Sequence, residues 1–391
     1  METKNKILTI NAGSSSIKLA IYTNTGQFCF KAEATNIGQA NGMLKISSSP
    51  QSTDISNLQV PSMLEAINKI LENYANQFFG ISGIGHRIVH GGPNFINPTL
   101  INNSLIRELN NLSIFDPEHL PIELELIKFF GSKFNSIPQV AVFDTFFFKD
   151  MPNIAKLLPL PRKYSALGLR RYGFHGLSYE YLLQEFEEKA GLKAAQGRII
   201  LAHLGSGASL TAIKDKKVID TTMSFSPASG ILMGTRSGDL DPAILMFLHK
   251  QTGMTIEQFN HMIHFDSGLL GVSEISADME ILLRESNQNE YAKIAVDLFC
   301  YQVLKAIGSL SAVLGGLDSL IFAGGIAEKA SIIRTKICEN LSYLGLSLDQ
   351  NRNKNHDFLI SANDSKIGVH LIQTDEASII AKHTKKIIEG E

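Results

Sequence analysis

One short segment occurs twice in the chain, and this repeat restricts the fold more than any other feature. Residues 7–21 read ILTINAGSSSIKLAI, and residues 199–213 read IILAHLGSGASLTAI. With a shift of 192 positions, four residue pairs coincide: Gly13 with Gly205, Ser14 with Ser206, Ala20 with Ala212, and Ile21 with Ile213. Each copy is an apolar run, a Gly/Ser turn and a second apolar run, which is the pattern of a β-hairpin. The shift is about half of the 391 residues, so the simplest interpretation is two similar α/β domains; chance similarity of two Gly/Ser hairpins is the alternative.

Composition supports a two-domain globular enzyme. The chain is longer than one hydrophobic core usually allows, and it has 44% hydrophobic and 19% charged residues. A net charge of -2 gives no electrostatic reason to expect a nucleic-acid partner. No uncharged run is long enough to span a bilayer, and the start METKNKILTI has no signal-peptide core. The three cysteines have no metal-binding spacing and are expected to be reduced thiols. We therefore predict a cytoplasmic protein without membrane contact.

Further apolar runs end in turns or polar residues and alternate with helical patterns. The runs are 84–89, 139–143, 320–323 and 369–372, and the helical patterns include 177–190 and 291–314. Strands that alternate with helices predict α/β architecture. The segment 291–314 is apolar but contains charged residues, so it is expected to be a buried or interface helix.

Four predicted strands end in residues able to bind ligands: Asn11, Asp144, His203 and Glu376. Ligands of α/β proteins usually bind beyond the carboxyl ends of strands, and carboxylates there suit Mg²⁺. For Asp144 or Glu376 taken alone, a helix cap or a turn is the more ordinary interpretation.

Two Gly/Ser turns are candidate phosphate sites. The turn NAGSSSIK combines backbone N–H groups, three hydroxyls and Lys18, which suits a phosphate, although it lacks the Walker pattern. An ordinary serine-rich hairpin explains this segment equally well. The second turn, LGSGAS, lacks the last glycine of the dinucleotide fingerprint, and a strand is expected after it, so a Rossmann domain is disfavoured.

Two arginines lie in glycine-rich apolar segments, Arg87 in GIGHRIVHGG and Arg236 in GILMGTRSGDLDP. A buried arginine needs an ion-pair partner or a bound anion, and phosphoryl transfer uses such cations. The alternative is a structural ion pair, for example between Arg236 and Asp239 or Asp241. His175 lies in the turn RRYGFHGLS, where a lone histidine is more often structural than catalytic. The glycines of GGIAE would let a ligand approach the backbone closely.

These motifs together resemble those of the acetate kinase family, which belongs to the acetate and sugar kinase, Hsp70 and actin superfamily. The resemblance covers nearly the full chain in the family's order: LTINAGSSSIK, GHRIVHGG, VFDT, RRYGFHGLS, HLGSGAS, MGTRSGDLDP, SGLLGVS, AGGIAE and YLGLSLD. It implies two duplicated ribonuclease H-like (actin-like ATPase) domains with a cleft between them and a homodimer. The implied limits are 1–145 with 376–391 for the N-terminal domain, and 146–375 for the nucleotide-binding and dimerisation domain. The implied reaction is reversible phosphoryl transfer between ATP and acetate with Mg²⁺ or Mn²⁺.

The resemblance also implies roles for individual residues. Arg87, Asp144, His175 and Arg236 would be catalytic, and Asn11 and Glu376 would serve the metal. The acetate pocket would comprise Arg87, Val89, Phe174, Pro227 and Leu232. The nucleotide and its phosphates would contact Ser14, Ser16, Lys18, His203, Gly205, Ser206, Gly207, Asp278, Gly325 and Ile326.

Five positions depart from the family pattern. Phe115 stands where the family has histidine, Ser206 where it has asparagine, Ser229 where it has glutamate and Glu280 where it has arginine, and Ala327-Glu328-Lys329 replaces Gly-Glu-Asn. These changes lie on the nucleotide side or the rim of the implied site. They leave the nucleotide preference open.

A carboxylate is already a competent nucleophile, so direct in-line transfer is favoured. An intermediate phosphorylated on an enzyme carboxylate is the alternative. A kinase for a longer acid and a non-kinase ATPase of the same fold are the rival functions. Val89 favours a short acid, although one methylene is worth only about 1–3 kcal/mol of discrimination. The two arginines disfavour a mere ATPase, which needs no carboxylate site.

Overall fold

The computed structural model describes residues 5–13, 15–49 and 52–390. The chain divides into two compact units. Unit 1 comprises Met1–Lys149 and Asp375–Glu391, and unit 2 comprises Asp150–Thr374. The C-terminal segment thus returns to the unit that the N-terminus begins.

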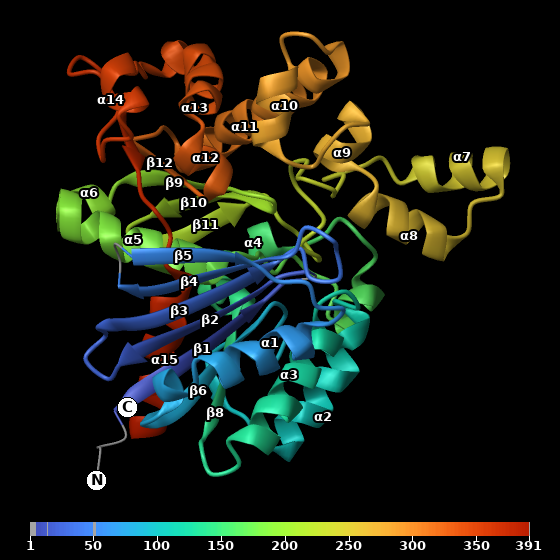
Figure 1. Cartoon of the computed structure of the whole chain (residues 1–391). Helices are drawn as coiled ribbons and strands as arrows, with labels where there is room; N and C mark the ends of the chain where they lie inside the picture. Colours follow the sequence, from blue (N-terminus) through green and yellow to red (C-terminus); the bar gives the residue numbers. More distant parts are fainter. Residues whose placement is uncertain (1–4, 14, 50–51, 391) are drawn as a thin grey trace. The chain divides into compact units, whose positions relative to one another are not determined.

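Unit 1 is built on an eight-stranded sheet in the order β5-β4-β3-β2-β1-β6-β8-β7 (Figure 1). The strands are β1 (Lys6–Ala12), β2 (Ile17–Thr23), β3 (Phe28–Thr35), β4 (Met43–Ser49), β5 (Ser52–Asn57), β6 (Ile81–Ile88), β7 (Thr99–Leu100) and β8 (Gln139–Phe143). The first five strands form an antiparallel meander, whereas β1, β6 and β8 run parallel. The carboxyl ends of these three parallel strands therefore meet at one edge of the sheet.

Helices cover both faces of this sheet. They are α1 (Met63–Asn73), η1 (Ala75–Phe78), α2 (Asn103–Asn111), η2 (Leu112–Ile114), α3 (Leu120–Lys133), η3 (Asp144–Phe148) and α15 (Glu376–Glu389). One face packs on α1 and α3 through residues such as Ile67 and Phe130. The opposite face packs on α15 through Ile7, Tyr22 and Ala381. Burying both faces explains why the central strands are apolar on both sides.

Glycines in β6 allow α15 to approach the sheet. A Cβ atom at Gly85 would lie 2.1 Å from Thr384 Oγ1 and 2.6 Å from Ile380 Cγ2. At Gly83 it would lie 2.1 Å from Ile388 Cδ1. Two glycines of the Arg87 segment therefore serve helix packing, and they fix the helix whose first residue is Glu376.

Unit 2 repeats the central topology in a five-stranded sheet of order β11-β10-β9-β12-β13. The strands are β9 (Arg198–Leu204), β10 (Ala208–Lys214), β11 (Lys217–Thr221), β12 (Ser319–Ala323) and β13 (Gly368–Leu371). Strands β9 to β11 are antiparallel, and β9, β12 and β13 are parallel, as are β1, β6 and β8 in unit 1. The predicted α/β class with a duplicated core is confirmed.

The strand register corrects the alignment of the two copies. Asn11 pairs with Lys18 across the first hairpin, and His203 pairs with Ser209 across the second. Asn11 and His203 are equivalent at the shift of 192, but the second turn is one residue shorter. The shift between the second strands is therefore 191 (209 − 18), and the coincidence of Ala20 with Ala212 is not a structural equivalence.

The helices of unit 2 surround its sheet and extend beyond it (Figure 1). They are α4 (Asn153–Lys156), η4 (Arg162–Leu167), α5 (Gly176–Ala190), α6 (Leu192–Ala195), α7 (Ala243–Thr252), α8 (Ile256–Phe265), α9 (Gly268–Ser273), α10 (Met279–Glu285), α11 (Glu290–Leu314), α12 (Gly325–Lys329), α13 (Ser331–Cys338), η5 (Glu339–Leu344) and α14 (Gln350–Lys354). Among the described residues, α11 alone is long and apolar enough to cross a membrane. It packs on α9, α10 and β10, and its buried residues include Phe299 and Ile307, so it is a core helix of unit 2.

Candidate active site

A buried arginine–aspartate pair lies at the carboxyl edge of the unit 1 sheet. Arg87 is near the end of β6, and Asp144 directly follows the neighbouring parallel strand β8. Arg87 donates from Nε to both carboxylate oxygens of Asp144 at 3.1 and 3.2 Å, and from Nη2 to Oδ2 at 2.6 Å. The Asp144 side chain is 1% exposed. Burial raises the pKa of Asp144, and the Arg87 guanidinium opposes part of that rise. The pair holds the guanidinium in one orientation.

Asn11 and Glu376 extend this network. Arg87 Nη1 donates to Asn11 Oδ1 at 3.2 Å, and Asn11 Nδ2 donates to Glu376 Oε2 at 2.7 Å. Glu376 is the first residue of α15, whereas the N-cap is Asp375, which accepts the backbone N–H of Ser378. The structure thus brings together Arg87, predicted from its glycine-rich segment, and three residues predicted from separate strand ends, Asn11, Asp144 and Glu376.

Sequence reasoning missed a fifth member, Glu123 of α3. This carboxyl is buried (3% exposed) and accepts the backbone N–H of Val89 at 3.1 and 3.3 Å. Burial and the charge of Asp116 raise its pKa well above the ordinary value, and the charge of Arg87 opposes the rise. Its signal in the sequence was one acid on the apolar face of LPIELELIKFF. Val89, itself buried, is held by this contact two residues after Arg87.

Of the residues predicted to bind a metal, Glu376 suits a divalent ion better than Asn11 does. Magnesium commonly uses one or two protein carboxylates and completes its shell with water and substrate phosphates. Glu376 supplies such a carboxylate, whereas the Asn11 oxygen faces Arg87 and its amide nitrogen faces Glu376. Within the described residues there is no group of three or more His, Cys, Asp or Glu suited to a metal. Glu376 is thus the carboxylate of this network that could hold such an ion together with water and substrate phosphates.

The serine-rich turn of unit 1 is described except for Ser14, which lies outside the described residues. Gly13 N–H donates to the carbonyl of Ser16 at 2.8 Å and closes the turn. Lys18 forms an ion pair of 3.2 Å with Glu33, and its side chain is 45% exposed. Burial opposes ionisation of Glu33, but the charges of Lys18 and Lys31 bring its pKa below the ordinary value. Lys18 therefore has a carboxylate partner in this structure.

Unit 2 holds His175 in an unusual backbone conformation at the start of α5. Its φ of 61° is left-handed, which is uncommon for a residue other than glycine and recurs at functional sites. The ring is nearly buried, and Nδ1 lies 2.8 Å from Ser209 Oγ. The preceding residue, Phe174, is also buried. Nε2 of His175 is directed at the β9–β10 turn, because a Cβ atom at Gly207 would lie 3.1 Å from it.

His203, at the end of β9, stacks on His175 with 4.5 Å between ring centres. Its Nδ1 lies 2.8 Å from Ser178 Oγ, and its Nε2 would be 3.6 Å from a Cβ atom at Gly205. The two predicted histidines therefore lie side by side with their Nε2 atoms toward the same glycine turn.

Arg236 lies on the loop between β11 and α7, and its Nη1 donates to the carbonyl of Pro227 at 3.2 Å. The acids proposed as alternative partners accept backbone N–H groups: Asp239 from Gly230 and Asp241 from Ala243. A Cβ atom at Gly207 would lie 3.9 Å from Arg236 Nη1, so the guanidinium is near the same turn as His175. The buried Leu232 is fixed by Gln302, which accepts its N–H at 2.7 Å.

The remaining predicted nucleotide residues lie in turns of unit 2. Asp278 is exposed and caps α10 by accepting the N–H of Glu280 at 2.8 Å. Ser206 is exposed, and its carbonyl accepts the N–H of Gly234 at 3.0 Å. Gly325 and Ile326 begin α12 directly after β12. A Cβ atom at Gly325 would meet nothing within 4 Å, so that backbone is open to a ligand.

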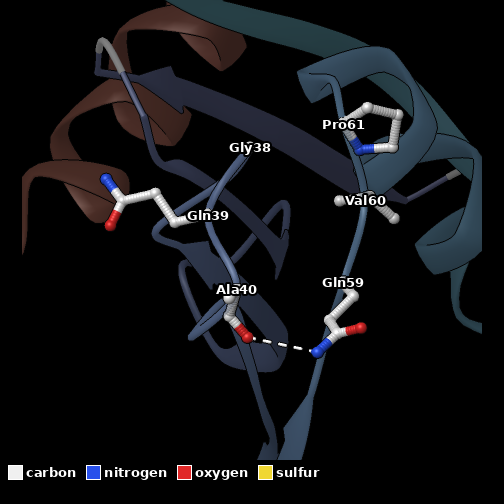
Figure 2. A pocket seen from close by; sticks show the side chains of 6 residues that line it. All are labelled: Gly38, Gln39, Ala40, Gln59, Val60 and Pro61. Carbon is white, nitrogen blue, oxygen red and sulfur yellow. Dashed lines mark hydrogen bonds between the residues drawn. The ribbon is translucent and has the colours of Figure 1, made fainter.

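A shallow depression on unit 1 has other lining residues (Figure 2). Its volume is about 320 Å³, and it is lined by Gly38, Gln39, Ala40, Gln59, Val60 and Pro61. The lining contains no charged side chain, and Gln59 Nε2 donates to the carbonyl of Ala40. We assign no ligand to it.

The comparison with known proteins decides the family. The family model described as the acetokinase family matches residues 6–382. The chain belongs to the acetokinase family. It is 39% identical to acetate kinase of Protochlamydia amoebophila, over 96% of this chain and 98% of that protein. It is 37% identical to propionate kinase of Escherichia fergusonii, over 98% of this chain and 96% of that protein.

Solved structures agree with this assignment. A propionate kinase from Francisella tularensis superposes with a TM-score of 0.90 at 33% identity, covering 98% of this chain and 100% of that one. Acetate kinase from Porphyromonas gingivalis superposes with a TM-score of 0.85 at 33% identity and the same coverage. The protein is therefore a short-chain carboxylate kinase of a family that uses ATP with a divalent metal. Relatives with both substrate names match almost equally well.

Proposed function

We propose that the protein is an acetate kinase that transfers the γ-phosphoryl group of ATP reversibly to acetate, giving acetyl phosphate and ADP. Val89 carries the choice of acetate. It is a buried, branched residue two positions after Arg87, and Glu123 fixes its backbone N–H. A branched side chain held in this way would leave little room for the extra methylene of propionate. Exclusion of one methylene gives about 1–3 kcal/mol of discrimination between the two acids. A propionate kinase is the alternative function.

In unit 1, Arg87 would bind the acetate carboxylate through its charge, and Asp144 would hold the guanidinium in place. Their bidentate contact supports this role, because a fixed guanidinium loses little freedom when a second anion binds. Glu376 would hold Mg²⁺ or Mn²⁺, and Asn11 would orient Glu376. The ion would offset the negative charge of the phosphates. Ser14, Ser16 and Lys18 would lie on the phosphate side.

In unit 2, His175 and Arg236 would donate to the oxygens of the transferring phosphoryl group. Both approach Gly207, because a Cβ atom there would lie 3.1 Å from His175 Nε2 and 3.9 Å from Arg236 Nη1. His203, Gly205, Ser206, Asp278, Gly325 and Ile326 would contact the nucleotide. Phe174, Pro227 and Leu232, all buried, would be the residues of unit 2 that contact the methyl group.

We favour direct in-line transfer. An acetate oxygen forms a bond to the γ-phosphorus while the bond from that phosphorus to the bridging oxygen of ADP breaks. Acetate is ionised at neutral pH, so no general base is required. An intermediate phosphorylated on an enzyme carboxylate, such as Asp144, is the chemical alternative. It would appear as label retained on the protein after incubation with [γ-³²P]ATP without acetate.

The proposal is tested by trapping acyl phosphate with hydroxylamine. The purified protein is supplied with formate, acetate, propionate or butyrate, each with ATP or GTP. We expect the highest kcat/KM with acetate, and we expect Val89→Ala to shift the ratio toward propionate by about tenfold. A higher kcat/KM with propionate in the unmodified protein would reverse the assignment. Nucleotide hydrolysis without any acyl phosphate would favour the non-kinase ATPase.

We also propose that the protein is a cytoplasmic homodimer. The support is α7, in which no residue is buried although its sequence is AILMFLHKQT. Phe247 of α7 is 63% exposed and Ile256 of α8 is 71% exposed, and the two helices are consecutive. A second copy of this chain is the expected partner of this apolar surface. Sedimentation of Phe247→Glu should show monomers, whereas a dimer of that variant would place the interface elsewhere.

A further inference from the structure

Each of the two stacked histidines is reached by a chain of two hydroxyl groups. Tyr179 Oη lies 2.5 Å from Ser209 Oγ, and Ser209 Oγ lies 2.8 Å from Nδ1 of His175. Tyr179 and Ser209 are completely buried. Burial raises the pKa of Tyr179 far above its ordinary value, and its hydrogen bond to Ser209 opposes part of the rise. The phenol therefore keeps its proton.

The second chain has the same form. Thr374 Oγ1 donates to Ser178 Oγ at 3.0 Å, and Ser178 Oγ lies 2.8 Å from Nδ1 of His203. Ser178 is completely buried, and Thr374 is the last residue of unit 2. Thr374 is held in turn by its backbone N–H, which donates to Glu328 Oε1 at 3.3 Å.

Proton counting gives both chains a direction. A serine hydroxyl has one proton, and it can accept one hydrogen bond while donating another. Tyr179 hydrogen-bonds both Ser209 and Thr211; we assign its one proton to the short contact of 2.5 Å with Ser209, and Ser209 then donates to His175 Nδ1. Thr374 and Ser178 act on His203 in the same way. A neutral imidazole that accepts at Nδ1 carries its proton on Nε2.

The position of the rings disfavours a state in which both imidazoles are charged. Two imidazolium charges would repel each other across the 4.5 Å between the ring centres. Both Nε2 atoms are directed at the glycine turn 205–207, because a Cβ atom at Gly207 would lie 3.1 Å from that of His175 and one at Gly205 would lie 3.6 Å from that of His203. Two N–H donors aimed at one glycine turn suit the oxygens of a phosphate group.

We propose that Tyr179 and Thr374 are positioning residues that fix the tautomers of His175 and His203, so that both rings present Nε2–H to phosphate oxygens at the 205–207 turn. The phosphate part of this inference rests on the proposed kinase function. The tautomer part concerns the protein alone.

The test is ¹⁵N nuclear magnetic resonance of the full chain labelled in histidine, because two-bond ¹H–¹⁵N correlations identify the protonated ring nitrogen. His175→Gln and His203→Gln assign the signals. We expect Nε2–H in both rings of the unmodified protein. Tyr179→Phe should release the tautomer of His175 alone, and Thr374→Val should release that of His203 alone, so each variant is the control for the other.

Ser311→Ala is a further control. Ser311 is buried on α11, outside both hydroxyl chains, and its hydroxyl donates to the carbonyl of Gly308 at 2.9 Å. We expect no change of either tautomer in this variant. We also expect Tyr179→Phe to lower kcat about tenfold, the factor for about one lost hydrogen bond, with the KM for acetate unchanged.

Three results would overturn the proposal: Nδ1–H in the unmodified protein, no tautomer change in both Tyr179→Phe and Ser209→Ala, or an equal change in Ser311→Ala. The first needs no variant, so a failure of Tyr179→Phe to fold leaves the test intact. Failure of the proposed kinase function is separate, because it would appear as absent acyl phosphate while the Nε2–H tautomers remain.

Discussion

Replacing Arg87 by alanine tests whether the Arg87–Asp144 pair is both a binding device and a structural element. Asp144 is 1% exposed and takes three of its hydrogen bonds from Arg87. Removing one member of a buried pair usually costs about 3–5 kcal/mol, since the other charge stays buried without a partner. We therefore expect Arg87→Ala to lower the free energy of unfolding by about that amount near neutral pH. Turnover should fall by about 10³–10⁵-fold, as for other arginines that serve phosphoryl transfer.

The stability loss should depend on pH in a defined direction. Burial raises the pKa of Asp144 already, and without Arg87 the pKa must rise further. A carboxyl with a raised folded-state pKa binds more protons when folded, so the variant loses stability as pH rises from its unfolded pKa to its folded pKa. The slope is at most about 1.4 kcal/mol per pH unit. The loss in free energy of unfolding caused by Arg87→Ala should thus be smaller at about pH 5.5 than at about pH 8.

Urea unfolding followed by circular dichroism, with EDTA and without nucleotide, measures this effect. Arg87→Ala with Asp144→Asn is the matched control, because the amide cannot ionise and the extra pH slope should vanish. Parallel pH dependences of the unmodified protein and Arg87→Ala would refute the reasoning. Full stability of Arg87→Ala at both pH values would show that Asp144 has another partner of equal strength.

Three other perturbations follow from individual contacts. Gly85→Ala should lower the free energy of unfolding by about 1–3 kcal/mol, because the new Cβ atom would lie 2.1 Å from Thr384 Oγ1; Gly308→Ala in α11, where the nearest atom is 3.7 Å away, is the control for urea unfolding. Glu376→Ala should raise the Mg²⁺ concentration for half-maximal activity, and an unchanged magnesium titration would contradict that role. Burial lowers the pKa of His370 from 6.5 to about 4, so the unfolded state binds more protons between these values and stability falls as the pH drops through them. The free energy of unfolding of His370→Leu, measured by urea denaturation, should lack this acid-induced loss of about 3 kcal/mol. An equal loss in the unmodified protein and in His370→Leu would contradict the prediction.

Strand ends were the most informative feature of the sequence. Asn11, Arg87 and Asp144 lie near the ends of β1, β6 and β8, and parallel pairing of these strands is what brings them together. The alternative interpretation of Glu376 as a helix cap is wrong, since the capping hydrogen bond of α15 is made by Asp375. The bidentate geometry of Arg87 was not predictable, because an ion pair and an anion site use the same residue types.

The roles of some residues could not be predicted because their partners are distant in the chain. Glu123 and Tyr179 lie in helical patterns where an acid and an aromatic residue are ordinary, and their roles depend on contacts with Val89 and Ser209. Gly85 belongs to the glycine-rich segment around Arg87, which was interpreted as a candidate anion-binding segment. Its nearest contacts instead belong to α15, about 300 positions later, so only the tertiary structure reveals its function.

The duplication explains how one scaffold came to support two kinds of site. Asn11 and His203 occupy equivalent places near the ends of β1 and β9, each beside a glycine turn. In unit 1 the equivalent position contacts Arg87 and Glu376, so it belongs to a network of opposite charges. In unit 2 it contacts Ser178 and stacks on His175, so it belongs to a network of hydroxyl groups and imidazole rings. The hairpin supplies a strand end and an open turn, and the neighbouring elements decide whether that place suits a cation or a phosphate.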